Sequence, residues 1–300
     1  MLAIDRILFP TDGSDCARVA HDRAATLAQQ HDAELHILNV VEERTNNLDN
    51  LAELIDIRQE DILRQLRIPV EPTRDGDVLK EQVTHPSAAG GILQYARTHD
   101  IDLIVMGTHG RRGVQRVLMG SVAEEVVRLA PCPVFTVCED ARKTEIEGGR
   151  MLVPLDFSVH SAALVAHAQA LAASFDASID LLHVIETISL PAVYGVEGDV
   201  FDEDDVRARS ADALAERAAE LDAHGIETHT HLRIGHPARS ILNFIEERGT
   251  SMVVIATHGR TGVEHLLLGS VAEKVVRMAP CPVFTVKSFG KSLVAEEEAT

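Results

Sequence analysis

A loop containing three glycines carries the residue types best suited to binding a phosphate group. Gly107-Thr-His-Gly110 is followed after nine residues by Gly120-Ser121, which opens a short amphipathic segment. We expect these three glycines to adopt positive φ, so that the main chain approaches an anion without an intervening Cβ. The free N–H groups of the following helix carry partial positive charge. The pattern predicts an anion site in which Ser121 either donates to phosphate or caps the helix, forming a capping box with Glu124.

A second polar loop, beginning Pro10-Thr11-Asp12, follows the first apolar run of the chain. A carboxylate at a strand end can accept hydrogen bonds from a nucleoside, or hold a metal ion that is bound to phosphates. Asp12 could equally cap the following helix, and Ser14 is a rival cap. Both interpretations stay open at the level of the residues.

The two loops occur twice, because the chain is an internal duplication. GSVAEEVVRLAPCPVFTV at 120–137 returns as GSVAEKVVRMAPCPVFTV at 269–286, and RILFPTDGS at 6–14 returns as RMLVPLDFS at 150–158. Two copies of this length indicate tandem domains and not a solenoid. We predict a first domain at 1–140, a linker at 141–149, a second domain at 150–288 and an acidic tail at 289–300. We expect the tail to be frayed.

Short apolar runs alternate with longer amphipathic stretches in each copy, as in an α/β fold. Runs such as IDLIVM and SMVVIA are apolar on both faces, which indicates strands buried between two helical layers. In the first copy we expect strands at 6–10, 34–41, 68–74, 101–106 and 133–137, and helices at 14–31, 48–67, 87–99 and 121–130. In such doubly wound sheets ligands bind at the carboxyl ends of the strands, where both polar loops would lie.

The charge of the chain limits its partners. Lys and Arg total 28 against 47 Asp and Glu, which gives a formal net charge of −19. This charge disfavours nucleic acid and anionic membranes. We find no targeting sequence and no long apolar run, so we expect a cytoplasmic protein without membrane insertion.

The combined motif resembles the universal stress protein family, in its tandem form and its ATP-binding branch. The resemblance rests on G-x-x-G, nine residues and G-S, with the opening PTDGS and the closing APCPVFTV, and it covers nearly the whole chain twice. It implies two Rossmann-like domains of the adenine nucleotide alpha hydrolase-like kind, each a five-stranded parallel sheet of order 3-2-1-4-5. It also implies a regulatory protein of the stress response that binds ATP, with or without Mg²⁺, and is not an enzyme.

The resemblance further implies which residues form the nucleotide sites. Asp12 would face the adenosine and the ribose, the main chain at Val40 would meet the base, and the glycine-containing loop would surround the phosphates. The first site comprises Pro10, Thr11, Asp12, Val40, Met106, Gly107, His109, Gly110, Gly120, Ser121 and Val122. The second comprises Pro154, Asp156, Val184, Ala256, His258, Gly259, Gly269, Ser270 and Val271. Because Ala256 replaces Gly107, we predict a weaker second site. We expect no metal ligands from the protein.

Two other functions remain open. An ATP-using enzyme of the PP-loop type is suggested by the partial match of Thr11-Asp-Gly-Ser-Asp15, and a domain for association without nucleotide would need only the fold. The duplicated PVFTV segments would form apolar sheet edges, which favours pairing of the two domains within the chain. A homodimer is a further candidate assembly.

Overall fold

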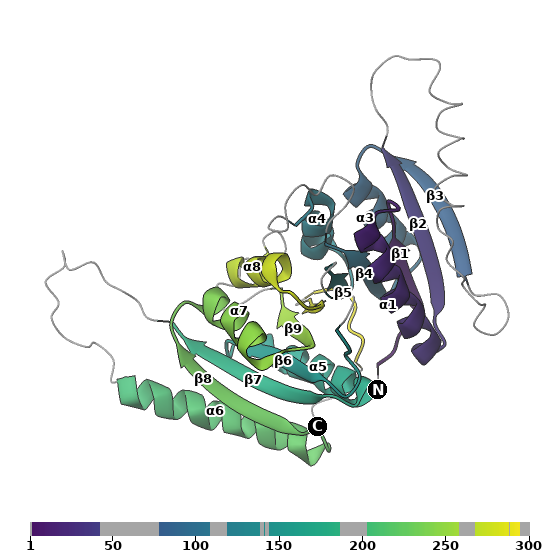
Figure 1. Cartoon of the computed structure of the whole chain (residues 1–300). Helices are drawn as coiled ribbons and strands as arrows, with labels where there is room; N and C mark the ends of the chain where they lie inside the picture. The colour runs from purple at the N-terminus through teal and green to yellow at the C-terminus, as the bar shows by residue number, and fades with distance from the viewer. Residues whose placement is uncertain are drawn as a thin grey trace, which may run out of the picture. The chain divides into compact units, whose positions relative to one another are not determined.

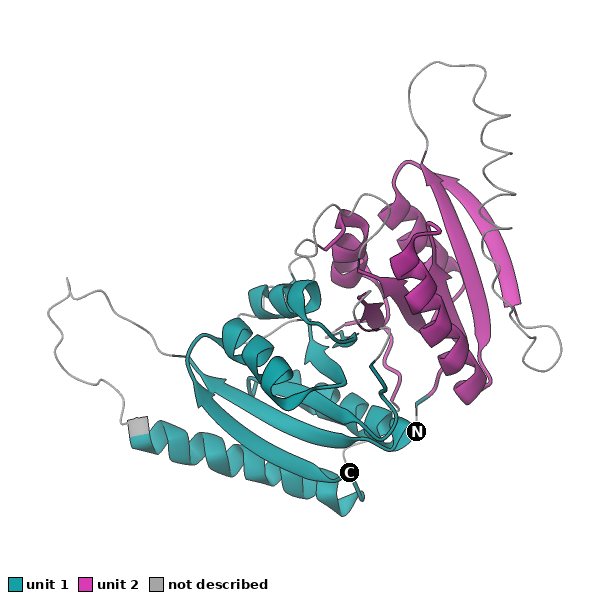
Figure 2. Cartoon of the chain, viewed as in Figure 1, with its two compact units in different colours: residues 1–2, 143–288 teal, residues 3–142, 289–300 magenta. Residues whose placement is uncertain are grey.

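The computed structural model describes residues 2–42, 78–108, 119–138, 141, 144–186, 203–257, 268–287 and 289–294. The chain forms two compact units, shown in magenta and teal in Figure 2. Residues 3–142 and 289–300 make the amino-terminal unit, and residues 1–2 and 143–288 make the carboxy-terminal unit.

The amino-terminal unit is built on a parallel sheet. Its strands lie in the order β3 (Val78–His85), β2 (Glu34–Glu42), β1 (Arg6–Pro10), β4 (Leu103–Gly107) and β5 (Val134–Val137). All four neighbouring pairs are parallel. The central strands are buried along almost their whole length, as their uninterrupted apolar sequences require. The predicted α/β class and strand order are confirmed.

Helices cover this sheet on both faces (Figure 1). They are α1 (Asp15–His31), α3 (Ala88–Thr98) and α4 (Ser121–Leu129). The strand order reverses direction after β1, so right-handed crossovers place α1 on one face and α3 and α4 on the other. In agreement, α3 packs against α4, and α1 packs against β1 and β4. The reversal creates the switch point at the carboxyl ends of β1 and β4.

The carboxy-terminal unit repeats this plan. Its parallel strands are ordered β8 (Thr228–Ile234), β7 (Ser178–Ile185), β6 (Arg150–Leu155), β9 (Met252–Ala256) and β10 (Val283–Val286). Its helices are α5 (Ser161–Phe175), α6 (Glu203–Ala223), α7 (Pro237–Arg248) and α8 (Ser270–Met278). The switch point here lies between β6 and β9.

The third strand of the amino-terminal unit differs from the prediction. It is β3, whereas the predicted strand at 68–74 and the predicted helix at 48–67 lie outside the described residues. β3 lies at the end of the sheet order, where it pairs with β2, and all of its residues are exposed or half-buried. Its sequence, VLKEQVTH, therefore lacks the apolar run that marks the central strands.

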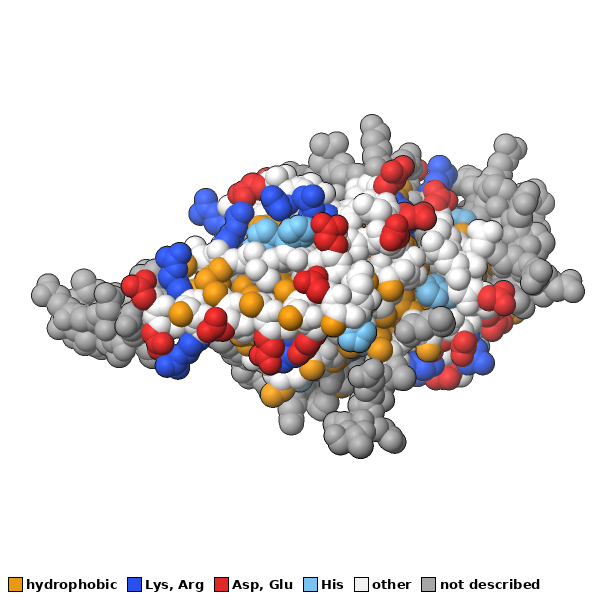
Figure 3. Space-filling view, turned by 90° about the horizontal axis from the view of Figure 1, so that it is seen from below, with side chains coloured by type: hydrophobic (Ala, Val, Ile, Leu, Met, Phe, Trp, Pro, Cys, Tyr) orange, Lys and Arg blue, Asp and Glu red, His pale blue; other side chains and the backbone are white. Residues whose placement is uncertain are grey.

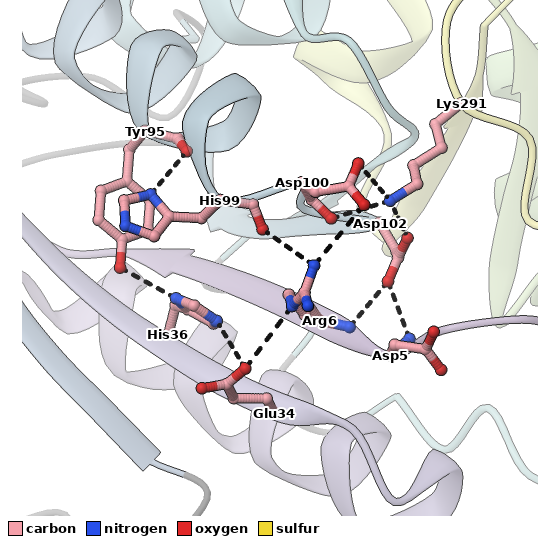
Figure 4. Close-up of polar contacts among 9 residues, drawn as sticks. All are labelled: Asp5, Arg6, Glu34, His36, Tyr95, His99, Asp100, Asp102 and Lys291. Carbon is pink, nitrogen blue, oxygen red and sulfur yellow. Dashed lines mark hydrogen bonds and ion pairs between the residues drawn. The ribbon is translucent and has the colours of Figure 1, made fainter.

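Residues 289–294 are not frayed, contrary to our expectation for the tail. They pack on the amino-terminal unit, where the Leu293 side chain is fully buried. The Ala3 amide donates to the Leu293 carbonyl at 2.8 Å, and the Lys291 amide donates to the Pro131 carbonyl at 2.8 Å. The Lys291 ammonium lies 2.9 Å from Asp100 Oδ1 and 2.5 Å from Asp102 Oδ1 (Figure 4). These contacts hold residues 289–294 on the amino-terminal unit.

Charged side chains of both signs are interspersed on the molecular face in Figure 3, with basic and histidine side chains gathered toward its upper left. No helix among the described residues has the length and apolar character that crossing a membrane requires.

Candidate functional site

The loop after β1 is folded by its own polar side chains. Asp12 Oδ1 accepts a hydrogen bond from the Ser14 amide at 3.0 Å, and Ser14 Oγ accepts one from the Ala17 amide at 3.2 Å. Ser14 is thus the N-cap of α1, and Asp12 is not. Asp12 instead shapes the turn that places its carboxylate at the carboxyl end of β1. Gly13 completes this turn at φ +76°, where a glycine is favoured.

A residue of β2 fixes the same loop, and sequence reasoning missed it. Asn39 Nδ2 donates to the Thr11 carbonyl at 2.9 Å, and the Thr11 amide donates to the Leu38 carbonyl at 2.8 Å. In the other unit His183 Nδ1 donates to the Leu155 carbonyl at 2.6 Å. Asn39 and His183 are repeat equivalents, each directly before the valine predicted to meet the base. The duplication was the signal that could have revealed them.

The predicted reason for Gly107 is wrong, because this glycine does not have positive φ. A Cβ at Gly107 would lie 2.8 Å from Cys16 Sγ and 3.2 Å from the Cys16 carbonyl carbon. Glycine is therefore required by the close approach of the first turn of α1 to the end of β4. The same contact places the start of α1 against the carboxyl end of β4, at the switch point.

The helix start after the second loop also differs from the prediction. Gly120 is the N-cap of α4 at φ −64°, not a residue with positive φ, and no side chain caps this helix. Ser121 is the first residue of the helix, so the predicted capping box with Glu124 is absent. The Ser121 side chain is exposed, and its hydroxyl has no hydrogen bond within the described part of the chain.

Main-chain contacts place the α4 N-terminus at the end of β4. The Gly120 amide donates to the Thr108 carbonyl at 2.8 Å, and the Glu124 amide makes the first bond of the helix, to the Gly120 carbonyl at 3.0 Å. The amides of Ser121, Val122 and Ala123 precede that bond and have no intrahelical acceptor. The arrangement presents donors and a helix dipole to an anion at the switch point.

The carboxy-terminal unit reproduces this arrangement. The Gly269 amide donates to the Thr257 carbonyl at 2.8 Å, and Gly269 is the N-cap of α8 at φ −58° without a side-chain cap. Ser270 is exposed at the first helical position. Asp156 Oδ1 accepts from the Ser158 amide at 3.0 Å, as Asp12 does from Ser14.

One residue changes the character of the second loop. Phe157, the equivalent of Gly13, has φ +55°, a conformation that bulky residues seldom adopt. Its ring lies against the His183 ring, with the centroids 4.5 Å apart. The carboxyl ends of β6 and β7 therefore carry an aromatic pair that the other unit lacks. Sequence reasoning did not anticipate this pair.

The described members of each predicted site lie at or near the carboxyl ends of the strands of their sheet. Pro10 and Pro154 are in the first strands, Val40 and Val184 in the second, and Met106 and Ala256 in the fourth. His109, Gly110, His258 and Gly259 fall outside the described residues. No group of three or more histidine, cysteine or carboxylate side chains in the described ranges is placed to hold a metal ion.

Comparisons with known proteins agree on one family. A family model for the universal stress proteins matches residues 3–137 and 149–287. A universal stress protein of Mycolicibacterium smegmatis is 25% identical over 293 residues, covering 94% of this chain and 96% of that protein. One from Methanocaldococcus jannaschii is 33% identical over 141 residues, covering 46% of this chain and 81% of that protein. The crystal structure of one from Archaeoglobus fulgidus has a TM-score of 0.66 at 22% identity, covering 94% and 98% of the two chains.

Proposed function

This chain belongs to the universal stress protein family, and from that premise we propose that it is a regulatory stress-response protein that binds ATP in each of its two units. Occupancy of the sites would change its shape or its choice of partner. Catalysis of a metabolic reaction is not part of the proposal.

The start of α4 is the observation that carries this proposal. Ser121 is exposed and does not cap its helix, and the first amides of α4 lack intrahelical acceptors. A serine at the N-cap would use its hydroxyl on its own helix, but Gly120 is the N-cap here, so the Ser121 hydroxyl is not needed for capping and is available to a ligand. Ser270 at the start of α8 shows the same arrangement, so the feature is common to both units.

The nucleotide would lie across the switch point. Its phosphates would accept hydrogen bonds from the Ser121 hydroxyl and from the Ser121 and Val122 amides. Asp12 would face the ribose, and the main chain at Val40 would meet the base. Asp156, Val184, Ser270 and Val271 would act in the same way in the carboxy-terminal unit. Any Mg²⁺ would arrive with the nucleotide, since no protein ligand set is proposed.

The two proposed sites differ most at the residue after the aspartate, Gly13 in one unit and Phe157 in the other. We predicted a weaker second site because alanine at position 256 would be strained at positive φ, but Gly107 does not have positive φ. The larger difference is Phe157, whose ring lies at the carboxyl ends of β6 and β7. We retain the prediction of unequal sites and attribute it to this aromatic side chain.

The test introduces a negative charge at the helix start. Ser121→Glu places a carboxylate where the phosphates would lie, and Ser270→Glu does the same in the carboxy-terminal unit. We expect each change to weaken ATP binding at its own site by at least about tenfold, because it replaces a charge-assisted hydrogen bond by repulsion. Isothermal titration calorimetry on the full chain measures both sites. Gln94→Glu, an exposed change in the middle of α3, is the control of equal charge.

Unchanged ATP affinity in both serine variants, or an equal loss in Gln94→Glu, would refute the site assignment. Absence of ATP binding by the unmodified chain, with Mg²⁺ present, would refute the function itself. We further propose a cytoplasmic location and pairing of the two units through 133–137 and 282–286. The ATP titration tests neither of these.

A further inference from the structure

A pocket of about 270 Å³ opens at the amino ends of the strands of the carboxy-terminal unit. The proposed nucleotide site lies at the opposite, carboxyl ends of these strands. β6 begins at Arg150, β7 begins at Ser178, and α7 ends at Arg248. The lining residues are Glu145, Gly148, Gly149, Arg150, Ser178, Arg248, Gly249 and Ser251.

The duplication supplies an internal comparison, because the same edge of the amino-terminal unit is crowded with carboxylates (Figure 4). Strand register makes Arg6 the equivalent of Arg150, since each pairs with the first residue of its second strand. At the positions of Asp5, Glu34, Asp100 and Asp102, the pocket has Gly149, Ser178, Gly249 and Ser251. At the position of His99 it has Arg248.

The backbone at the two edges is nevertheless held in the same way. Asp102 Oδ2 accepts from the Arg6 amide at 2.8 Å, and Ser251 Oγ accepts from the Arg150 amide at 2.6 Å. The carboxy-terminal unit therefore lacks these carboxylates but keeps the hydrogen bond to the main chain at the start of its first strand. In the amino-terminal unit, by contrast, Lys291 fills the edge and contacts two carboxylates.

Two arginines line the pocket under different constraints. Arg150 Nη1 donates to the Arg248 carbonyl at 3.0 Å, and Arg150 Nε lies 3.6 Å from Asp180 Oδ2. These contacts orient Arg150 and leave its other terminal nitrogen for a ligand. The Arg248 guanidinium has no ion pair or hydrogen bond within the residues that the structure describes. An oriented arginine beside an unpaired one suits an oxoanion, which accepts several hydrogen bonds from such forks.

Two carboxylates oppose this charge and limit the expected affinity. Asp180 is fully buried, and its Oδ1 accepts from His231 Nε2 at 2.8 Å, so this carboxylate contacts both His231 and Arg150. Glu145 is the one carboxylate among the lining residues, and it is exposed to solvent. Solvent screens an exposed carboxylate more than a buried one.

We propose that this pocket is a second kind of site, which binds a small oxoanion such as inorganic phosphate or the phosphate group of a small metabolite. Arg150 and Arg248 hold the anion, and the Ser178 hydroxyl donates to it. Asp180 is a positioning residue that acts through Arg150. The site is independent of the nucleotide loops, from which it is separated by the length of the strands.

The experiment titrates inorganic phosphate into the full chain at constant ionic strength. The chain carries Ser121→Glu and Ser270→Glu, so that binding at the helix N-termini is suppressed. We expect a dissociation constant on the order of 1 mM, as for a few charge-assisted hydrogen bonds in an open pocket. Arg248→Gln should weaken binding by about tenfold. Arg239→Gln removes the same charge from an exposed position at the other end of α7 and should leave binding within about twofold.

A second variant copies the amino-terminal unit. Gly249 has φ +62° and its equivalent Asp100 has φ +52°, so Gly249→Asp fits a conformation that aspartate already adopts at this position. It should abolish phosphate binding without unfolding the unit, and Glu145→Gln should strengthen binding. Circular dichroism confirms folding of each variant. No saturable phosphate binding, or equal losses in Arg248→Gln and Arg239→Gln, would overturn the proposal.

Discussion

At the scale of single residues, the site depends on close approaches more than on unusual backbone angles. Gly107 is needed because Cys16 occupies the space of a Cβ, and Cys16 Sγ donates to the Val137 carbonyl at 3.4 Å. One side chain thus connects α1, β4 and the end of β5. No motif analysis of the loops pointed to Cys16, since its partners are far away in the sequence.

This contact predicts a rescue. Gly107→Ala should lower the free energy of unfolding by about 1–3 kcal/mol, because the added methyl group overpacks the contact with Cys16. Cys16→Ala removes the Sγ atom, so the double variant should recover most of the loss. Chemical denaturation of the four proteins in the cycle measures the coupling. Purely additive effects would show that the backbone of Cys16, and not its thiol, excludes the methyl group.

At the scale of helices and strands, buried histidines make stability depend on pH. His21, His36 and His167 are buried, and burial lowers the pKa of each imidazole because the charged form loses hydration. Nearby acceptors, such as Asp22 beside His21 and the Ala163 carbonyl at 2.7 Å from His167 Nδ1, oppose this shift only in part. The unfolded chain therefore binds more protons than the folded chain just below pH 6.5.

The sign of the effect follows from this difference. Stability is full above about pH 6.5 and falls as the pH drops toward the folded-state pKa values, since the unfolded state gains protons first. We expect a lower melting temperature at pH 5.5 than at pH 7.5. His167→Leu should reduce this difference, while the exposed His224→Leu serves as the control. The same pH difference in both variants would exclude His167 as a cause.

At the scale of the whole molecule, the chain is a duplication in which each terminal segment belongs to the compact unit formed by the other copy. Residues 289–300 belong to the compact unit of residues 3–142, and residues 1–2 belong to that of 143–288. Asp102 keeps little exposure beneath the tail, and Lys291 supplies its counter-charge. Partial burial alone would lower the pKa of Lys291, but hydrogen bonds to Asp102 and Asp100 outweigh it and raise that pKa.

Removing the tail should destabilise one unit selectively. Deletion of residues 289–300 uncovers the site of Leu293 and leaves Asp102 without its ammonium partner. We expect a loss of about 2 kcal/mol from the Leu293 side chain alone. Hydrogen exchange should rise in peptides from 3–142 and stay unchanged in peptides from 143–288. A shorter deletion, of residues 295–300, is the control. Equal exchange after both deletions would mean that the contacts of 289–294 contribute nothing.

The sequence alone determined the α/β class, the duplication and the strand ends at which the polar loops begin. These features follow from apolar runs, repeats and strand ends, which are local or periodic properties of the chain. It also located Asp12, Ser121 and their equivalents. Whether Asp12 or Ser14 caps α1 was left open, and the structure gives the cap to Ser14. The predicted capping box of Ser121 with Glu124 is absent, because the same residues also suit a helix with Gly120 as its N-cap.

Only the tertiary structure decided which distant groups share space. The contacts of Cys16 with Gly107, of Asn39 with Thr11 and of Lys291 with Asp102 join residues 28 to 189 positions apart. The edge strand β3 was missed for a related reason, since pairing with β2 holds a segment that buries little apolar surface. Such contacts depend on packing between elements, and packing leaves no periodic trace in the sequence.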